Sequence, residues 1–463
     1  MKLHNTLTRK IEEIKPIKEG EISLYTCGLT VYSQPHIGNW VPYIYWDVLQ
    51  RTLQTEGYKI KRVQNITDVG HLTSDEDAGE DKMLKSALSE GTTAWDVANK
   101  YIAVANHEAY ELLGLIKPKY LPRATDYIAQ QIEFVKQLEA KGFTYKIADG
   151  VYFDTSKLND YGKLAQLDIK GLRFGARVAD TGKKNPTDFA VWKFSPSDEK
   201  RDMEWDSPWG KGFPGWHLEC SAIVREILGD QIDIHTGGID HIPVHHTNEI
   251  AQTEALTGKT LANTWVHANH IKVNGTKMSK SLGNVYTLKD ITDKGFSIDA
   301  FKLMILSKHY QTEGNFTWEN LEAAQNRLKR WQNIAELRWQ EDKAISSGTG
   351  NPDTQDAFAE HIHNDINTPA AIEALEKYLG HMEDLHFCSP CMDNAYGLLE
   401  TYFGLDIFAS TPDISKELYD KIRGREAARS SKDWVKSDQL RDELKDQGIS
   451  LRDTDNGAVW YRI

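Results

Sequence analysis

The stretch Tyr25–Trp40, which reads YTCGLTVYSQPHIGNW, constrains the fold more than any other part of the chain. The β-branched and aromatic residues from Ile22 to Tyr32 predict a buried strand. A turn with Pro, His and Gly follows, and apolar residues then recur at helical spacing up to Gly57. A strand that turns into a helix N-terminus directs backbone N–H groups and the positive end of the helix dipole at one place. The stretch therefore predicts an anion site, with a phosphate as its natural occupant.

Three side chains of this stretch can take part in chemistry. His36 and Asn39 bring donors to the same edge, and Cys27 projects from the strand into the same crevice, where a thiolate can bind a metal. A four-residue HIGN match also occurs by chance, and a lone cysteine in a strand is usually an inert core residue. These alternatives stay open until the rest of the chain is considered.

Composition excludes several classes of protein. With 463 residues, 40% hydrophobic and 27% charged, the chain is expected to be an ordinary globular protein of about three or more domains. No signal segment or apolar run of membrane-spanning length appears, so we expect a cytoplasmic protein. Four cysteines do not make a disulfide framework, which favours metal or thiol chemistry. A net charge of −13 argues against a general polyanion binder but leaves room for a local basic face.

The first half of the chain alternates strands and helices and then breaks that rhythm. Tyr58–Thr67 predicts a second strand and Thr92–Leu113 a helix. From about residue 118 to 214 we expect an insertion between two halves of one nucleotide-binding sheet, with a helix at 126–141 and a hairpin at 143–153. Its Gly, Lys and Arg-rich middle, residues 171–184, could contact a polyanion, although an exposed loop is the more common interpretation.

The second half of the sheet carries more chemistry. Ile232–His235 predicts a short strand, and the glycines that follow allow a ligand to approach the backbone. The next helix, which ends at Gly258, carries His245 and Glu249 four residues apart and therefore on one face. Such a pair can bind one divalent metal, although an isolated pair is more often a surface contact.

A further strand, predicted at Thr264–Val273, leads into NGTKMSKSLGN at residues 274–284. Its lysines could close over phosphates and neutralise charge that develops in phosphoryl chemistry. A basic loop by itself is normally a solvated turn. This one directly follows the sheet of the predicted phosphate site, which favours the functional interpretation.

From Thr317 onward the pattern is helical. Trp318–Asp342, Gln355–Asn364 and Pro369–Asp384 predict a helical bundle. The last unit is expected to contain one long helix through Ala428 and Leu444, followed by a hairpin that turns at residues 455–457.

Taken together, these motifs resemble the cysteinyl-tRNA synthetase family of class I aminoacyl-tRNA synthetases. HIGN and KMSKS indicate the class, and five further blocks narrow the resemblance to the family: YTCGLTVY, GWHLECSA, DIHTGG, VHHTNEIAQ and ARSSKDWVKSDQLRDELKDQGISLRDT. The resemblance implies an α/β fold, with a Rossmann-type parallel-sheet catalytic domain split by an insertion, an α-helical bundle, and a small C-terminal α/β anticodon-binding unit. The implied boundaries are 1–117 and 215–273 for the catalytic halves, 118–214 for the insertion, 274–316 for the KMSKS loop and stem-contact region, 317–408 for the bundle and 409–463 for the anticodon-binding domain.

The resemblance also implies an activity and the residues that perform it. The enzyme would activate L-cysteine with ATP and transfer it to the 3′-terminal adenosine of its tRNA, with Mg²⁺ accompanying ATP and with neither DNA nor a membrane as a partner. One zinc ion would select the thiol of cysteine and would be held by Cys27, Cys220, His245 and Glu249. Gly28, Thr67 and Trp216 would line the cysteine pocket. His36, Gly38, Asn39, Gly237, Gly238, Asp240 and Lys280 would bind ATP, and His36, Asn39, Lys277 and Lys280 would act in catalysis. Arg429, Trp434, Asp438 and Asp453 would contact the anticodon, although Trp434 could equally be a core residue of its helix.

The chain departs from the family pattern at three places. HIGN stands for HIGH, residues 67–71 read TDVGH where an acidic run is usual, and residues 237–240 read GGID in place of GGSD. Beyond the family sites, His381, His386, Cys388 and Cys391 could hold a second metal, although one CxxC without a matching pair is weak evidence.

Three other functions are compatible with parts of the pattern. A ligase that joins cysteine to an amino sugar shares the zinc site but lacks the anticodon-binding end. A catalytically silent RNA-binding relative would have lost zinc ligands or KMSKS lysines, and a zinc hydrolase would keep an open position for water. The complete set of motifs favours the synthetase.

Overall fold

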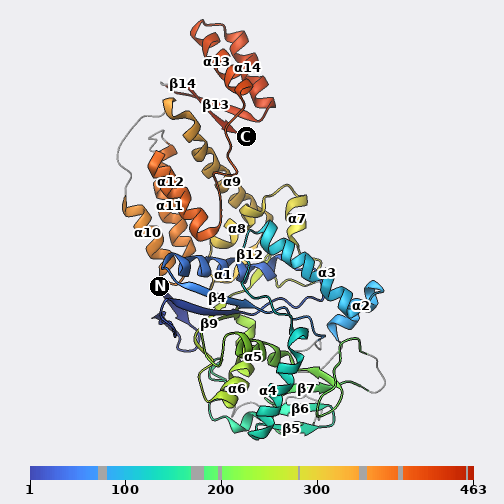
Figure 1. Cartoon of the computed structure of the whole chain (residues 1–463). Coiled ribbons are helices and arrows are strands. Elements are labelled where there is room, and N and C mark those ends of the chain that lie inside the picture. The colour runs from blue at the N-terminus through green and yellow to red at the C-terminus, as the bar shows by residue number, and fades with distance from the viewer. Residues whose placement is uncertain are drawn as a thin grey trace. The chain divides into compact units, whose positions relative to one another are not determined.

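The computed structural model describes residues 1–70, 81–167, 182–196, 201–279, 282–343, 352–383, 389–454 and 457–463 (Figure 1). The chain forms two compact units. The first comprises Met1–Ile291 with Tyr310–Phe316, and the second comprises Thr292–His309 with Thr317–Ile463. None of the helices in the described part of the chain is long and apolar enough to cross a membrane.

A parallel four-stranded sheet organises the first unit. Its strand order is β10-β9-β3-β4, with α1 between β3 and β4 in sequence and α6 between β9 and β10. Figure 1 shows α1 on one face of the sheet and α5 and α6 on the other. The bounds are β3 Glu21–Thr26, α1 Ile37–Thr55, β4 Lys59–Gln64, α5 Trp216–Ile227, β9 Ile232–Gly238, α6 His245–Thr257 and β10 Ala262–Ala268. This sheet confirms the Rossmann-type class expected from the sequence.

The order of the strands fixes where a ligand can bind. β3 pairs with β4 on one side and with β9 on the other, so the connections leave the middle of the sheet in opposite directions. In open parallel sheets, ligands bind at such a switch point, beyond the carboxyl ends of the strands. Cys27 directly follows β3, and Gly237 and Gly238 end β9, so the predicted site residues lie at this position.

The insertion forms a second sheet. Four antiparallel strands in the order β5-β6-β7-β8 share a core with α4, in which the rings of Phe153 and Phe189 stack 5.1 Å apart. The sequence predicted the helix and only the first hairpin, because β7 and β8 follow long stretches without a clear pattern. The basic middle lies largely outside the described residues, so its contact with a polyanion stays a prediction. The bounds are α4 Ile128–Ala140, β5 Thr144–Ile147, β6 Gly150–Phe153, β7 Phe189–Phe194 and β8 Gly212–Pro214.

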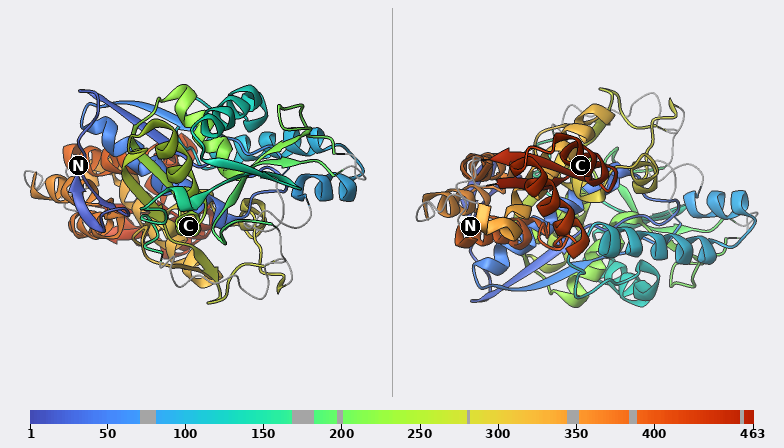
Figure 2. Two further views of the ribbon diagram at one scale, coloured as in Figure 1. Left: turned by 90° about the horizontal axis from the view of Figure 1, so that it is seen from below. Right: turned by 90° about the horizontal axis from the view of Figure 1, so that it is seen from above.

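Smaller elements complete the first unit. Helices α2 and α3 lie side by side in all views (Figures 1 and 2). The strand predicted at Thr264–Val273 is wrong as one element: β10 ends at Ala268, and β11 then pairs in parallel with β12. The bounds are β1 Lys2–Asn5, β2 Lys10–Glu13, α2 Lys82–Glu90, α3 Ala94–Asn106, η1 His107–Leu112, η2 Ala124–Tyr127, η3 Thr155–Lys157, η5 Ile239–His241, β11 Ile271–Val273, α7 Leu288–Asp293 and β12 Gly314–Phe316.

The second unit is helical and ends in a hairpin, as expected. The single long C-terminal helix of the sequence prediction is wrong, because Lys432 adopts a positive φ of 61° and Asp433 caps a new helix by accepting from the N–H of Lys436. Two helices and a hairpin therefore enclose a small core around Trp460. The bounds are α8 Ile298–Leu306, α9 Trp318–Ala335, η7 Glu336–Lys343, α10 Pro352–His363, α11 Thr368–Glu383, α12 Ser389–Leu398, η8 Leu399–Phe403, α13 Lys416–Ser430, α14 Trp434–Asp446, β13 Ile449–Thr454 and β14 Gly457–Arg462.

Candidate active site and metal centre

The four predicted zinc ligands meet at the switch point of the sheet. Cys27 comes from the end of β3, Cys220 from α5, and His245 and Glu249 from one face of α6. One donor atom from each of them lies within 4.8 Å of each of the others, and all four side chains are buried. Two thiols, an imidazole and a carboxylate form a donor set typical of transition-metal sites in proteins. The donor chemistry therefore fits a metal ion.

Charge is concentrated at Glu249. Its carboxylate lies 2.9 Å from Nε2 of His245 and 3.0 Å from Nε2 of His235. Burial opposes ionisation, but the charges of both histidines hold the pKa of Glu249 well below its usual range. Burial likewise opposes a charged His245, yet Glu249 raises the pKa of that imidazole to about 10. Without a metal, the cluster therefore holds a buried ion pair.

The two thiols differ in acidity. Burial, and then a hydrogen bond to Cys220, raises the pKa of Cys27 well above its usual value. Burial also opposes ionisation of Cys220, but the hydrogen bond from Cys27 and the neighbouring His245 lower its pKa. The cluster therefore favours the thiolate at Cys220 and keeps a proton on Cys27.

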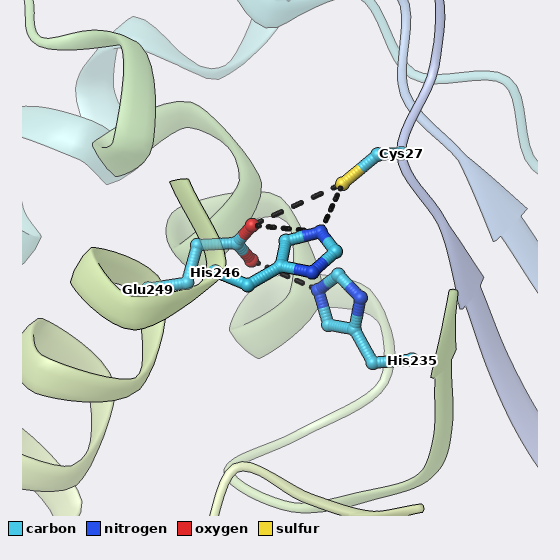
Figure 3. Close-up of side chains that lie close together, drawn as sticks. All are labelled: Cys27, His235, His246 and Glu249. Carbon is cyan, nitrogen blue, oxygen red and sulfur yellow. Dashed lines mark hydrogen bonds and ion pairs between the residues drawn. The ribbon is translucent and has the colours of Figure 1, made fainter. Parts of the chain in front are cut away.

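Sequence reasoning missed two histidines of the cluster, His235 and His246. They form a second donor set with Cys27 and Glu249, again within 4.8 Å of one another (Figure 3). Nε2 of His246 lies 3.2 Å from Sγ of Cys27. The i, i+4 rule selects His245 and overlooks the adjacent His246, which the first turn of α6 directs toward β9. The signal that could have found them is the run of histidines in DIHTGG and VHHTNE, which follow one another across a βα unit.

Gly237 makes room for this second set. A Cβ atom at this position would lie 2.5 Å from Cε1 of His246 and 2.8 Å from Nδ1 of His241. The sequence attributed this glycine to the approach of a ligand, and the structure shows that the approaching groups include two side chains of the protein. Gly238 and the exposed Asp240 follow at the rim, where Asp240 lies 3.9 Å from His270. Their contact with adenosine stays a prediction.

The predicted cysteine-pocket residues lie beside the metal cluster. The backbone N–H of Gly28 donates to Oδ1 of Asn65 at 2.7 Å, and the amide of Asn65 donates to Oγ1 of Thr67 at 3.0 Å. A Cβ at Gly28 would lie 1.5 Å from the carbonyl oxygen of Asn65, so this approach requires glycine. The ring of Trp216, half-buried, lies 4.4 Å from that of His245. Their contact with cysteine stays a prediction.

The HIGN turn begins α1 as expected. His36 is the N-cap, and its N–H donates to Oδ1 of Asn39 at 2.9 Å. This bond uses the acceptor of the Asn39 amide and leaves its NH₂ group as a donor. A Cβ at Gly38 would lie 2.2 Å from Cε of Met278, so the KMSKS segment packs directly on the turn.

The KMSKS segment is held by hydrogen bonds of Asn284. Its Oδ1 accepts from the N–H of Ser279 at 2.8 Å, and its amide donates to the carbonyl of Lys277 at 3.2 Å. The side chain of Lys277 is exposed. Lys280 and His71 lie outside the described residues, as do His386, Cys388 and the side chains of His381 and Cys391, so the predictions for Lys280 and for a second metal stay predictions.

The predicted anticodon residues gather in the second unit. Trp434 is 55% exposed, which makes the alternative of a core residue wrong. The guanidinium of Arg429 lies 5.8 Å from its ring and 3.3 Å from a carboxylate oxygen of Asp453. Arg425 also pairs with Asp453, at 2.8 Å, whereas Asp438 pairs with Arg441. An exposed indole flanked by arginine suits an unpaired base.

Known proteins match the chain in sequence and in fold. The family model described as tRNA synthetases class I (C) catalytic domain matches residues 13–326, and the model described as Cysteinyl-tRNA ligase anticodon binding domain matches residues 411–462. A protein of Burkholderia lata named "Cysteine--tRNA ligase 1" is 41% identical over 459 residues, covering 98% of this chain and 95% of its own. The "Cysteine--tRNA ligase" of Treponema denticola is 38% identical over 491 residues and covers both chains completely.

Solved structures agree with this assignment at the level of the fold. The methionyl-tRNA synthetase of Mycobacterium tuberculosis, in complex with methionyl-adenylate, superposes with a TM-score of 0.62 at 14% identity, covering 84% of this chain and 92% of the other. The agnB2 LeuRS of Agrobacterium radiobacter, in a ternary complex with tRNA and LeuAMS, also gives 0.62, at 12% identity, with 87% and 86% covered. From its parallel sheet, its sequence motifs and these matches along its length, this chain belongs to the cysteinyl-tRNA synthetase family of class I aminoacyl-tRNA synthetases.

Proposed function

We propose that this chain activates L-cysteine with ATP and transfers it to the 3′-terminal adenosine of the tRNA that carries the cysteine anticodon. The buried cluster of Cys27, Cys220, His245 and Glu249 is the observation that carries the proposal. A cytoplasmic location is part of the same proposal, because this chemistry needs both cysteines as reduced thiols.

Zinc suits the cluster better than a hard cation does. Mg²⁺ and Ca²⁺ prefer oxygen ligands, whereas two sulfurs and one imidazole nitrogen are typical of Zn²⁺ sites. When bound, Zn²⁺ would supply a coordination position that takes a thiolate in strong preference to a hydroxyl. A hydrophobic pocket alone separates cysteine from serine poorly, because the two differ only by sulfur in place of oxygen at one position. The pocket residues Gly28, Thr67 and Trp216 would orient the rest of the amino acid.

The residues of the chain contribute to activation by orientation and charge stabilisation. The carboxylate of cysteine is already ionised, so no side chain has to remove a proton. As its oxygen bonds to the α-phosphorus, the bond to pyrophosphate breaks, and negative charge develops on the departing oxygens. The amide NH₂ of Asn39, the ring of His36 and the backbone of the Gly38 turn would supply hydrogen-bond donors to these oxygens. Lys277 and Lys280 would add positive charge from the KMSKS side, and Mg²⁺ would enter with the phosphates of ATP.

The HIGN turn and the KMSKS segment pack against each other, which supports a joint role in activation. The N–H of Ile37 donates to the carbonyl of Tyr286 at 2.8 Å, and Met278 fills the space above Gly38. The turn and the lysine segment are therefore in contact, which supports the proposal that both act on the same phosphates.

The second unit supports tRNA as the acceptor. Trp434 offers a stacking face, and Arg429, Asp438 and Asp453 offer hydrogen-bonding groups to base edges. This unit argues against the ligase that joins cysteine to an amino sugar, since that enzyme has no use for an anticodon-binding end. A zinc hydrolase is also disfavoured, because the HIGN and KMSKS motifs and an anticodon-binding end have no use in metal-assisted hydrolysis.

Cysteine-dependent ATP–pyrophosphate exchange tests the proposal. We expect exchange with cysteine and not with serine, loss of exchange when the protein is stripped of zinc, and recovery when Zn²⁺ is restored. Charging of tRNA then tests the second step. Absence of exchange in zinc-loaded, folded protein would favour the silent RNA-binding alternative, whereas zinc binding without any ATP dependence would favour a hydrolase.

A further inference from the structure

A continuous line of buried hydrogen bonds runs from the metal cluster to the N-terminal segment. Nε2 of His246 lies 3.2 Å from Sγ of Cys27, and Nδ1 of the same ring lies 2.7 Å from Nε2 of His267. Nδ1 of His267 in turn lies 2.7 Å from Oγ1 of Thr6. Thr6, His267 and His246 are each at most 4% exposed, so water does not replace any of these contacts.

Thr6 is held in this position by its own segment. Its N–H donates to the carbonyl of Trp265 at 2.8 Å, and Oδ1 of Asn5 accepts from the N–H of Trp265 at 3.1 Å. These bonds attach the segment to the outer edge of β10, the strand that carries His267. These bonds therefore fix the position of the Thr6 hydroxyl relative to His267.

Counting protons along the line shows what the hydroxyl does. Each contact holds one proton, and a neutral imidazole carries one N–H. If Cys27 is a thiolate, as a metal ligand must be, the proton on Nε2 of His246 points at sulfur. Nδ1 of His246 then accepts from His267, and Nδ1 of His267 accepts from the O–H of Thr6. If Cys27 is instead a thiol that donates to Nε2 of His246 and not to Cys220, all three bonds reverse, and the oxygen of Thr6 accepts.

Only a group that can both donate and accept satisfies the end of this line in both states. We propose that Thr6 is a positioning residue of the metal cluster, whose hydroxyl acts through His267 and His246 to orient a hydrogen bond onto the sulfur of Cys27. This inference rests on the proposed metal site. It adds to that site a residue from the N-terminal segment, which contains none of the four proposed ligands. Outer hydrogen bonds of this kind orient metal ligands and change metal affinity by about 10- to 100-fold.

The test compares three variants of the full-length chain. Thr6→Val keeps the shape and removes the hydroxyl, whereas Thr6→Ser keeps the hydroxyl. Arg9→Lys is the matched control, because Arg9 belongs to the same segment and bonds to the carbonyl of Leu164 at 2.8 Å, while lysine keeps the positive charge that acts on His267. Two measurements are made on each: the dissociation constant of Zn²⁺ by competition with a chelator, and the thiolate-to-metal charge-transfer band of the Co²⁺-substituted protein.

We expect Thr6→Val to bind Zn²⁺ at least about tenfold more weakly and to shift the Co²⁺ band, since the sulfur loses an oriented donor. Thr6→Ser and Arg9→Lys should stay within about twofold of the native chain, in keeping with the same principle. Native affinity and an unshifted band in Thr6→Val would overturn the proposal. Equal weakening in Arg9→Lys would also overturn it, because packing of the segment would then be the cause. Zinc uptake by the native chain tests the proposed metal site, and only the difference between variants tests Thr6.

Discussion

Zinc binding by this chain should depend steeply on pH. The perturbation is a change from pH 7.5 to 6.5 on metal-free, folded protein. A zinc ligand must be deprotonated, so each ligand that holds a proton in the metal-free state releases it on binding. His245 has its pKa raised to about 10 by Glu249, and burial raises the pKa of Cys27 above its usual value. Both groups are therefore protonated throughout this range.

The magnitude follows from that count. Each released proton changes the apparent affinity about tenfold per pH unit, so two protons give about 100-fold weaker Zn²⁺ binding per unit of acidification. The pKa of Cys220 is lowered, so Cys220 adds less to this slope than Cys27 does. An unpaired histidine would titrate near pH 6.5 and would contribute only part of a proton above pH 7. A slope well below two would therefore mean that His245 or Cys27 does not hold its proton in the metal-free protein.

Two independent assays measure the proton count. Competition with a chelator of known pH dependence gives the slope of affinity, and calorimetry in two buffers of different ionisation enthalpy gives the number of protons released. Agreement of the two methods controls for buffer binding to the metal. A slope of one or less would refute the reasoning, since it would mean that Glu249 does not hold the proton on His245.

The ion pair also affects the metal-free fold. The raised pKa of His245 contributes stability that is fully present below about pH 6.5, the ordinary histidine value, and is lost as pH rises toward about 10. The lowered pKa of Glu249 contributes stability that is present above about pH 4.3 and is lost as pH falls. The free energy of unfolding of the metal-free protein should therefore be lowest at strongly acidic and at strongly alkaline pH.

Three substitutions separate structural from functional roles. Asn39→Asp keeps the acceptor that caps α1 but removes the amide donor. The free energy of unfolding should change by less than about 0.5 kcal/mol, while ATP–pyrophosphate exchange falls about 100-fold or more. Unchanged exchange would mean that Asn39 has no role in catalysis. Gly28→Ala forces a methyl group against the Asn65 carbonyl and should lower the free energy of unfolding by about 1–3 kcal/mol in urea denaturation; native stability would contradict the geometry. Trp434→Ala removes an exposed ring, so stability and exchange should not change. The KM for tRNA should rise by about 5- to 150-fold, equivalent to about 1–3 kcal/mol of stacking. An unchanged KM would exclude stacking.

The sequence patterns were sufficient for the sheet, and the family resemblance named the four residues of the first donor set. Periodicity located β3, α1, β9 and α6, and the order of parallel strands then brings Cys27 and the face of α6 to one edge. The sequence was insufficient where a role depends on neighbours in space. His235 and His246 have no distinctive spacing, and their place in the cluster follows only from the pairing of β3 with β9. The break at Asp433 was missed because helical spacing continues across it, whereas a cap residue and a positive φ at Lys432 end the first helix.

The two overlapping donor sets lead to a last prediction about metal loss. Both sets contain Cys27 and Glu249, whereas Cys220 and His245 belong only to the first. Cys27→Ser therefore leaves three donors in either set and should lose zinc almost completely. Cys220→Ser leaves four donors in the second set, because His246 can move its proton to Nδ1 and free Nε2 for the metal.

We expect Cys220→Ser to retain up to one zinc per chain with weaker affinity, and yet to lose cysteine-dependent exchange, since the retained ion would be bound by a different set of side chains. Metal analysis by mass spectrometry after dialysis, with the exchange assay on the same samples, measures both quantities. Equal loss of zinc from the two variants would show that His235 and His246 serve as hydrogen-bond partners of the ligands and do not bind metal themselves. Zinc content and exchange therefore have to be measured together, because retained metal in Cys220→Ser would not by itself show that the native donor set is intact.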